Sequence, residues 1–324
     1  MDNPLTNAKI ENYYPNSSFI LKVTPETEEQ DIVSWIYKNA KEIDNFLASS
    51  PALLMRGFKV ASNGSFSRLC NAFSEPLPYV YQSTPRTKIE QGIYTATEYP
   101  KTESIPQHCE NSYQKVWPMR LYFHCEKAAE EGGETPLGDV KKITSEIPEE
   151  IISKFREKKV MYVRNYSPGL DLPWQTVFQT ENKSDVENFC RKNSIEFEWV
   201  DGCSLRTRQV CQGTAIHPNT GDELWFNQAH LFHVSNLEPS IKEMLLGILP
   251  EQDLPRNAFY GDGTPIEDDV LAEIRRVFNS NKHNIEWQDN DILMIDNMLC
   301  SHGRNPYIGE RKVLVSMNTP SSPK

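Results

Sequence analysis

Apolar residues recur with two different periods along this chain, and each period predicts one kind of element. Residues 26–48 place them every three to four positions, as an amphipathic helix requires. They are Ile32, Trp35, Ile36, Ala40, Ile43 and Phe46. From about residue 92, short β-branched and aromatic runs separated by turn residues predict strands instead. We therefore expect helical structure early in the chain and a mainly β arrangement after it.

The remaining elements follow from the same two periods. Strands are expected at 52–55, 93–97, 119–125, 160–163, 195–200, 205–210, 223–226, 292–295 and 311–317. Further helices are expected at about 65–74, 139–157, 183–193 and 266–279. Many short strands interrupted by helices favour a barrel or sandwich with helices packed outside it.

No linker-like break divides the chain, so we expect a single domain over residues 1–324 with a frayed tail at 319–324. The stretch 165–182 is broken by proline and glycine. It is either a lid over a site or a surface excursion.

Composition narrows the class of protein. The chain has 45 acidic and 34 basic residues and a net charge of −11, which disfavours binding to nucleic acid or to an anionic membrane. No run approaches the roughly 18 apolar residues of a membrane-spanning helix. The first residues do not resemble a secretory signal, and the seven cysteines contain no CxxC pair. We expect a cytoplasmic protein with reduced thiols.

Two of the seven histidines begin a His-Cys-Glu tripeptide, one at His108–Glu110 and one at His124–Glu126. Because side chains alternate in an extended segment, the imidazole and the carboxylate share a face. Two histidines and one carboxylate form a facial iron site with three open positions. The tripeptide alone is weak evidence, since this composition gives roughly one by chance.

The surroundings favour the first tripeptide. His124 lies inside an alternating strand with one apolar face and one more polar face, which needs no metal to explain it. His108 and Glu110 come instead at a strand end, where sites are commonly assembled. We expect Cys109, which points to the opposite face, to be a small buried apolar residue. The pair His124 and Glu126 remains the alternative.

The other chemical groups lie far along the chain. His302 follows the apolar strand 292–295, and Arg311 opens the last strand. Alternation places Arg311 on the apolar face of that strand, while Lys312 faces the other way. A buried guanidinium needs an anionic partner, which is either an acidic side chain or the organic acid of a cosubstrate.

Together these residues resemble the iron(II)/2-oxoglutarate-dependent oxygenases of the TauD/TfdA superfamily, and most closely the clavaminate synthase-like and SyrP-like branch. The resemblance spans about residues 50–318. Its motifs are His108-x-Glu110, Gly132–Pro136, His302–Arg304 with Arg311, Arg56–Phe58, Pro85–Thr87, Tyr94–Glu98 and Glu223–Asn227. It implies a mainly β fold with flanking helices, a distorted double-stranded β-helix (jelly roll) with iron at one open end.

The resemblance also implies roles for single residues. His108, Glu110 and His302 would bind Fe(II), Thr135 would donate its hydroxyl to 2-oxoglutarate, and Arg311 would bind the distal carboxylate of that cosubstrate. The carboxylate ligand is Glu here, where much of the superfamily has Asp, and the clavaminate synthase-like branch tolerates this change. A ligating carboxylate argues against a halogenase, whose pattern has a small residue at that position.

What the resemblance implies about function is an enzyme that consumes O2 and 2-oxoglutarate and releases succinate and CO2. We expect it to hydroxylate an amino acid or an amino-acid derivative, free or bound to a carrier protein, in secondary metabolism. The alternatives are a sulfonate or small organic-acid oxygenase of the TauD type, and a desaturase or cyclase on the same scaffold. A jelly-roll binding protein without turnover is the non-enzyme alternative.

Some features have a structural and a functional interpretation. Gly132–Pro136 taken alone is typical of a tight turn. His230 and His233 would form a metal pair if helical, but positions in a pocket wall or on a surface loop are favoured. Arg206 and Arg208 share a strand face. We favour a solvent-exposed face as the explanation over contact with a substrate carboxylate.

Overall fold

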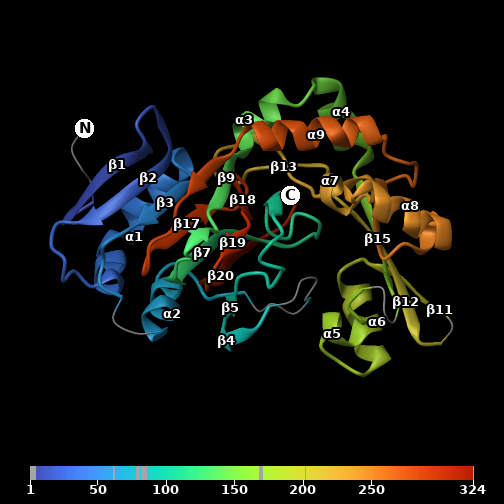
Figure 1. Cartoon of the computed structure of the whole chain (residues 1–324), viewed down its shortest axis with the longest axis horizontal. Coiled ribbons are helices and arrows are strands. Elements are labelled where there is room, and N and C mark those ends of the chain that lie inside the picture. The colour runs from blue at the N-terminus through green and yellow to red at the C-terminus, as the bar shows by residue number, and fades with distance from the viewer. Residues whose placement is uncertain are drawn as a thin grey trace.

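Two facing β-sheets form the centre of the computed structural model, which describes residues 5–60, 63–77, 81, 86–167, 171–200 and 202–323 (Figure 1). The larger sheet has the order β1 (Ala8–Tyr14), β2 (Ser17–Pro25), β3 (Ala52–Met55), β17 (Ile292–Asp296), β7 (Trp117–Lys127), β20 (Lys312–Ser321), β5 (Ile93–Thr95) and β4 (Lys88–Glu90). The smaller sheet has the order β16 (His283–Ile285), β9 (Thr135–Asp139), β18 (Cys300–Arg304) and β6 (Ile105–His108). Two sheets packed in this way are the arrangement expected of a jelly roll.

The alternation expected in the central strands places their side chains in two separate cores. Between the sheets, Phe123 of β7 and Val315 of β20 pack with Leu137 of β9. On the opposite face, Tyr122 of β7 and Leu314 of β20 pack under α1 (Ile32–Ser49) and α2 (Asn63–Asn71). Side chains on both faces are therefore shielded from water, which stabilises a sheet built from such apolar strands.

One sequence-based expectation about β7 is wrong. The face that carries Tyr122 and His124 was expected to be the more polar one, yet the two side chains are 0% and 3% exposed. The cause is a contact with another element: α2 covers this face, and its Phe66 ring lies 5.3 Å from the His124 ring.

The expectation of one long helix at 139–157 is also wrong. The segment is divided into α3 (Val140–Glu146) and α4 (Glu149–Lys158), because Pro148 disfavours helical backbone in the residue before it.

A further sheet with the order β11 (Glu196–Val200), β12 (Ser204–Cys211), β10 (Val160–Tyr166) and β15 (Arg256–Tyr260) lies beside the jelly roll, at the right in Figure 1. It packs with α5 (Trp174–Phe178) and α6 (Lys183–Lys192) around a small core of Tyr166, Trp174, Phe178 and Leu205. Part of the stretch 165–182 therefore has a core of its own, while residues 168–170 lie outside the described residues.

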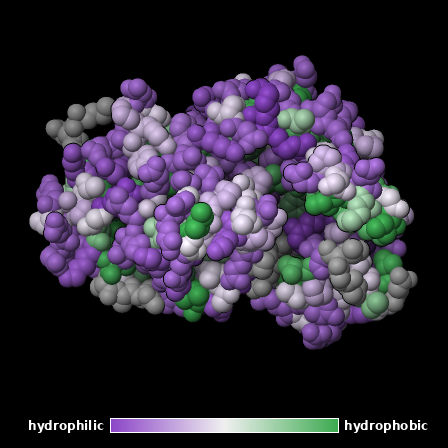
Figure 2. All heavy atoms as spheres, in the orientation of Figure 1, coloured by the Kyte–Doolittle hydropathy of each residue, from purple (hydrophilic) through white to green (hydrophobic). Residues whose placement is uncertain are grey.

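Three short helices and a long one lie near this sheet and the jelly roll. They are α7 (Ala229–Phe232), α8 (Pro239–Ile248), η1 (Val234–Asn236) and α9 (Asp268–Ser280). Helix α8 has no buried residue, and Ile241, Met244 and Ile248 are exposed at its surface, at the right in Figure 2. No helix in the described part of the chain is long and apolar enough to cross a membrane.

The smaller elements complete the fold. They are β8 (Glu131–Gly132) paired with β19 (Tyr307–Ile308), β13 (Thr214–Ile216) paired with β14 (Glu223–Trp225), and η2 (Glu251–Asp253). The hairpin β1–β2 and strands β9, β15, β16 and β18 were not among the strands expected from the sequence, whereas β6 ends at His108, where a strand end was expected. Several are short or polar, as in the sequence Cys-Ser-His-Gly-Arg of β18, and only pairing with neighbours identifies them as strands.

The expected frayed tail is ordered at its start. Strand β20 continues to Ser321, which pairs with Trp117 of β7. Residues 319–321 thus belong to the larger sheet, because the long strand β7 provides a partner for them; Lys324 lies outside the described residues.

One ion pair joins strands that are far apart in sequence. Arg56, after β3, donates from Nε and Nη2 to the two carboxylate oxygens of Asp291 at 2.9 and 2.6 Å, just before β17. The Asp291 side chain is 1% exposed and also accepts from the backbone N–H of Gln288 at 2.7 Å. A buried, bidentate pair of this kind is costly to break from one side.

We predict that Asp291→Ala lowers the free energy of unfolding by about 3 kcal/mol, because it leaves the Arg56 guanidinium without its partner. Urea denaturation measures the loss. The control is Glu11→Ala, which breaks surface pairs with Lys9 and Lys22 and should cost about 0.5 kcal/mol. Equal losses of unfolding free energy in the two variants would show that the buried pair contributes no more to stability than the surface pairs.

Candidate metal centre

The pairing of β6 with β18 places two of the predicted residues face to face. His108 ends β6, His302 is the middle residue of β18, and the two are direct partners in the antiparallel ladder. Their rings have centroids 4.5 Å apart. Directly opposed residues in such a pair project to the same side of the sheet, so the register alone points both imidazoles at one place.

Glu110 reaches the same place from the turn after β6. Its backbone N–H donates to Asn297 Oδ1 at 2.7 Å, and Asn297 Nδ2 donates back to the Glu110 carbonyl at 2.9 Å. Asn297 Nδ2 also donates to the carbonyl of Pro118 at 2.7 Å. One fully buried amide therefore holds the turn that carries Glu110 against β7.

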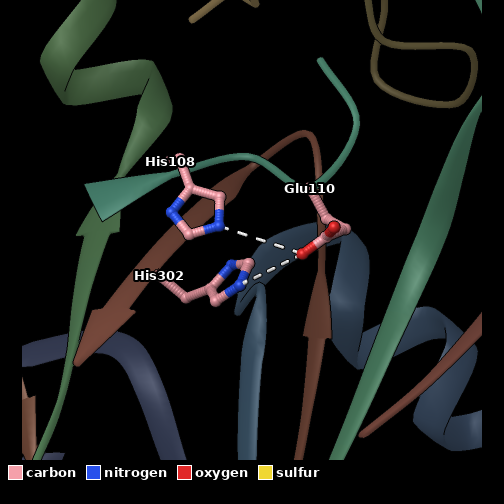
Figure 3. A group of neighbouring side chains, drawn as sticks. All are labelled: His108, Glu110 and His302. Carbon is pink, nitrogen blue, oxygen red and sulfur yellow. Dashed lines mark ion pairs between the residues drawn. The ribbon is translucent and has the colours of Figure 1, made fainter. Parts of the chain in front are cut away.

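The three side chains converge on one point (Figure 3). Glu110 Oε2 lies 3.8 Å from Nε2 of His108 and 3.8 Å from Nε2 of His302, and the three atoms lie within 4.8 Å of one another. His108 Nδ1 lies 2.9 Å from the carbonyl of Pro106, to which it can donate, leaving the Nε2 lone pair free. Two imidazoles and one carboxylate in a facial arrangement are a donor set that fits Fe(II).

The charge state of these groups also suits a metal. Burial lowers the pKa of His302 well below its usual value, so its imidazole is neutral at pH 7. Burial would raise the pKa of Glu110, but the charge of Arg86 and the hydrogen bond from His108 hold it below its usual range. Arg86 Nη2 donates to Glu110 Oε2 at 2.9 Å, and both side chains are buried. The carboxylate is therefore ionised, as a ligand must be.

The expected cosubstrate residues lie beside this point, in what we call the Arg311 cavity. Its walls include His108, His302, Thr135 and Arg311, together with Arg86, Ala96, Thr97, Ile105, Phe123, Gly303, Arg304 and Val313. Arg311 donates from Nε to the carbonyl of Gly133 at 3.0 Å, and no carboxylate in the described part of the chain forms an ion pair with it. Burial lowers its pKa to about 10, so it stays charged at pH 7.

The segment Gly132–Pro136 forms a turn that places Thr135 in the wall of the Arg311 cavity. Gly132 and Gly133 have φ of +69° and +73°, which favours glycine. A Cβ on Gly133 would lie 3.0 Å from Arg311 Cδ, so the bare backbone allows Arg311 to pack against it. Thr135, the first residue of β9, accepts a hydrogen bond from Trp287 Nε1 at 2.9 Å.

A second cavity, the Phe232 cavity, lies on another side of Glu110. Its volume is about 170 Å³, and it is lined by Arg86, Thr97, Ile105, Pro106, His108, Glu110, Tyr113, Gln228, Leu231, Phe232 and Arg256. Arg256 pairs there with Asp171, donating from Nε at 2.8 Å and from Nη2 at 3.0 Å. The stretch 165–182 thus contacts a wall of this cavity through Asp171.

The second tripeptide is not part of the cluster. His124 is buried against Phe66, and Glu126 pairs with Lys312 at 2.6 Å. Among the described residues, His108, Glu110 and His302 are the only group of three with metal-ligand spacing. Cys109, between the two ligand candidates, is buried among apolar side chains as expected.

The other histidines and arginines singled out from the sequence are not part of the cluster. His230 lies in α7 and His233 is the C-cap of that helix, so the expectation of a surface loop is wrong. The expectation that His230 lines a pocket is confirmed. Arg206 pairs with Asp253, and it also donates to Asn165 at 2.7 Å. Arg208 lies 3.8 Å from a carboxylate oxygen of Glu198. Acidic side chains of the protein therefore occupy the place that a substrate carboxylate would need.

Two contributors to the site were missed. The sequence indicated Arg86 only as part of the motif Pro85–Thr87, and it gave no sign of a role for Asn297. Glu110 and Asn297 are 187 residues apart, so no local pattern could have connected them.

Comparison with known proteins supports the same family as the motifs. The family model described as taurine catabolism dioxygenase TauD, TfdA family matches residues 20–317. The dapdiamide synthesis protein DdaC of Enterobacter agglomerans is 44% identical over 87% of this chain and 86% of its own length. A clavaminate synthase-like protein of Arabidopsis thaliana is 28% identical over 85% of this chain and 83% of its own. The clavaminate synthase-like resemblance is confirmed, and the SyrP-like one stays a prediction.

Solved structures support the fold. PvcB of Pseudomonas aeruginosa superposes with a TM-score of 0.58 at 16% identity, covering 98% of this chain and 92% of its own. AAD-2 in complex with Mn(II) and N-oxalylglycine gives a TM-score of 0.57 at 10% identity, covering 98% of each chain. The expected jelly roll with flanking helices is confirmed.

We predict that His108→Ala weakens Fe(II) binding by more than about tenfold, because it removes one of three converging ligands. His124→Ala should keep the metal and cost about 1–3 kcal/mol of stability, as a buried side chain is lost. Iron bound after anaerobic loading and gel filtration, together with urea unfolding, measures both. Iron retained by His108→Ala and lost by His124→Ala would move the site to the second tripeptide.

Proposed function

We propose that this chain, which belongs to the taurine catabolism dioxygenase TauD, TfdA family, binds Fe(II) through His108, Glu110 and His302 and hydroxylates an amino acid or an amino-acid derivative. The enzyme class is that of the family, the Fe(II)- and 2-oxoglutarate-dependent dioxygenases. The observation that carries the ligand assignment is the convergence of two Nε2 atoms and one carboxylate oxygen between the Arg311 cavity and the Phe232 cavity.

When bound, the iron would use O2 and 2-oxoglutarate to oxidise a substrate C–H bond, with one oxygen atom entering the product and the other entering succinate, and with release of CO2. The protein's part is to hold both organic molecules at the right distance and to exclude water. The buried side chains around Glu110 support that role.

In the Arg311 cavity, Arg311 would bind the distal carboxylate of 2-oxoglutarate. A charged, largely buried guanidinium that lines a cavity without an acidic partner among the described residues supports this, because such a group favours an anion. Thr135 accepts a hydrogen bond from Trp287, which leaves its own hydroxyl proton to donate to the cosubstrate.

Arg86 would hold Glu110 in place for the metal. Its guanidinium lies against the carboxylate oxygen that faces both histidines. Since Arg86 also lines both cavities, it offsets negative charge where a carboxylate ligand and an anionic cosubstrate meet.

The Phe232 cavity would receive the substrate. The 44% identity to a dapdiamide synthesis protein supports an amino-acid-derived substrate, free or presented on a carrier protein. The family match over residues 20–317 supports one oxygenase domain, and seven cysteines without a disulfide support a cytoplasmic location. The stretch 165–182 would act as a lid through the contact of Asp171 with Arg256.

The proposal is tested by succinate release across a panel of free amino acids and carrier-loaded aminoacyl groups, with mass spectrometry of the products in chloride-containing buffer. We expect gain of one oxygen atom with the true substrate, and loss of two hydrogen atoms if the chain is a desaturase or cyclase. Succinate release only with small sulfonates would favour the TauD-type alternative. A chlorinated product would contradict Glu110 as a ligand, because its carboxylate occupies the position a halide needs.

We predict further that Arg311→Lys weakens the affinity for 2-oxoglutarate by about 1.5–3 kcal/mol, because lysine keeps the charge but loses the bidentate fork. Anaerobic titration of the Fe(II) protein with 2-oxoglutarate measures it. Lys312→Ala is the matched control, since Lys312 is exposed and pairs with Glu126. A larger loss in the control would mean that the neighbouring lysine is the cosubstrate-binding residue.

A further inference from the structure

A third cavity, the Arg275 cavity, lies between β6, α7 and α9 and has no role in the function proposed above. Its volume is about 190 Å³. It is lined by Ser104, Ile105, Pro106, Gln107, Pro136, His230, Leu231, Asn236, Arg275, Phe278, Asn279, Lys282 and Asn305. None of these residues is acidic, in a chain whose net charge is −11.

Two cations face this cavity without a carboxylate to neutralise them. Arg275 donates to the carbonyl of His230 at 2.8 Å and to Ser235 Oγ at 3.0 Å, both uncharged acceptors. Within the described ranges, neither Arg275 nor the exposed Lys282 forms an ion pair with an acidic side chain. Asp268 acts on Arg275 only from a distance, since it is paired with Lys242 at 2.7 Å. The cavity therefore has a positive potential.

Two buried side chains in the same wall have unused hydrogen-bonding atoms. His230 is 1% exposed and Gln107 is 2% exposed, and the amide oxygen and nitrogen of Gln107 and one ring nitrogen of His230 have no hydrogen-bond partner among the described residues. The backbone carbonyl of Gln107 lies near the His230 ring. Burial, with the nearby charge of Arg275, lowers the pKa of His230 to about 3, so the ring is neutral and its single N–H can donate either to that carbonyl or to a ligand. Leaving such groups without partners is costly, and a polar ligand in the cavity would satisfy them.

The Arg275 cavity adjoins the Phe232 cavity. Ile105, Pro106 and Leu231 line both, and the Phe232 cavity continues to His108 and Glu110. The two cavities are therefore neighbours, and a molecule spanning both would place one end beside the metal ligands and the other beside the cations.

We propose that the Arg275 cavity binds an anionic oxygen group, a carboxylate or a phosphate, at the end of the substrate remote from the reacting carbon. Arg275 and Lys282 supply the charge, and His230 and Gln107 supply neutral hydrogen bonds. The substrate class is thus an elongated, anionic amino-acid derivative. This step rests on the proposed function in taking the Phe232 cavity as the place of the reacting carbon.

The test is calorimetric titration of the full chain, loaded with Mn(II) and saturated with 2-oxoglutarate, with inorganic phosphate and separately with acetate. We expect one saturable site, weakened about tenfold or more in Lys282→Glu and in Arg275→Gln, since each loses a charged hydrogen bond. Lys41→Glu makes the same charge change in α1, which lines none of the three cavities, and should bind as the wild type does.

The two anions distinguish the sources of the group. Binding of phosphate alone indicates a phosphate-bearing substrate, and binding of acetate indicates a carboxylate. Absence of saturable binding for both anions overturns the proposal, as does binding that Lys282→Glu and Arg275→Gln leave unchanged. Because no turnover is measured, this failure differs from a failure of the proposed function, which would appear as absent iron binding or absent succinate release.

Discussion

The register between β6 and β18 is the constraint on which the rest of the site depends. It sets His302 directly opposite His108, and it ends β6 at the residue before the turn that carries Glu110. A shift by one residue would turn one imidazole to the other side of the sheet. Contacts with the larger sheet also support this arrangement, because Asn297 joins the Glu110 turn to Pro118 of β7.

The buried charges of this protein divide into two kinds. Arg56 and Asp291 satisfy each other and join distant strands. Arg311 and Arg275 instead reach cavity walls with only neutral acceptors described for them. A partly buried cation in a cavity wall without an acidic partner favours an anionic ligand, which is the role proposed above for both residues. The presence of an acidic partner thus distinguishes an arginine that stabilises the fold from the arginines proposed to bind a ligand.

The arrangement of cavities gives each organic molecule a separate place. The Arg311 cavity lies beside the two sheets of the jelly roll, where Thr135 begins β9 and Arg311 directly precedes β20. The Phe232 cavity lies toward α7 and β15, which lie beyond the two facing sheets. In the proposed function, the inner sheets would hold the residues that bind iron and the cosubstrate, while the added elements form the walls that would select a substrate.

The sequence by itself determined what depends on neighbouring residues. Strand alternation predicted that Arg311 and Lys312 face opposite ways, and the strand-end position of His108 separated it from His124. Local periodicity is enough for these, because a strand repeats every two residues. Only the tertiary structure decided which face of β7 is covered, where Arg86 and Asn297 lie, and how the three cavities adjoin. These depend on contacts between segments as far as 187 residues apart, and no periodic pattern along the chain records such contacts.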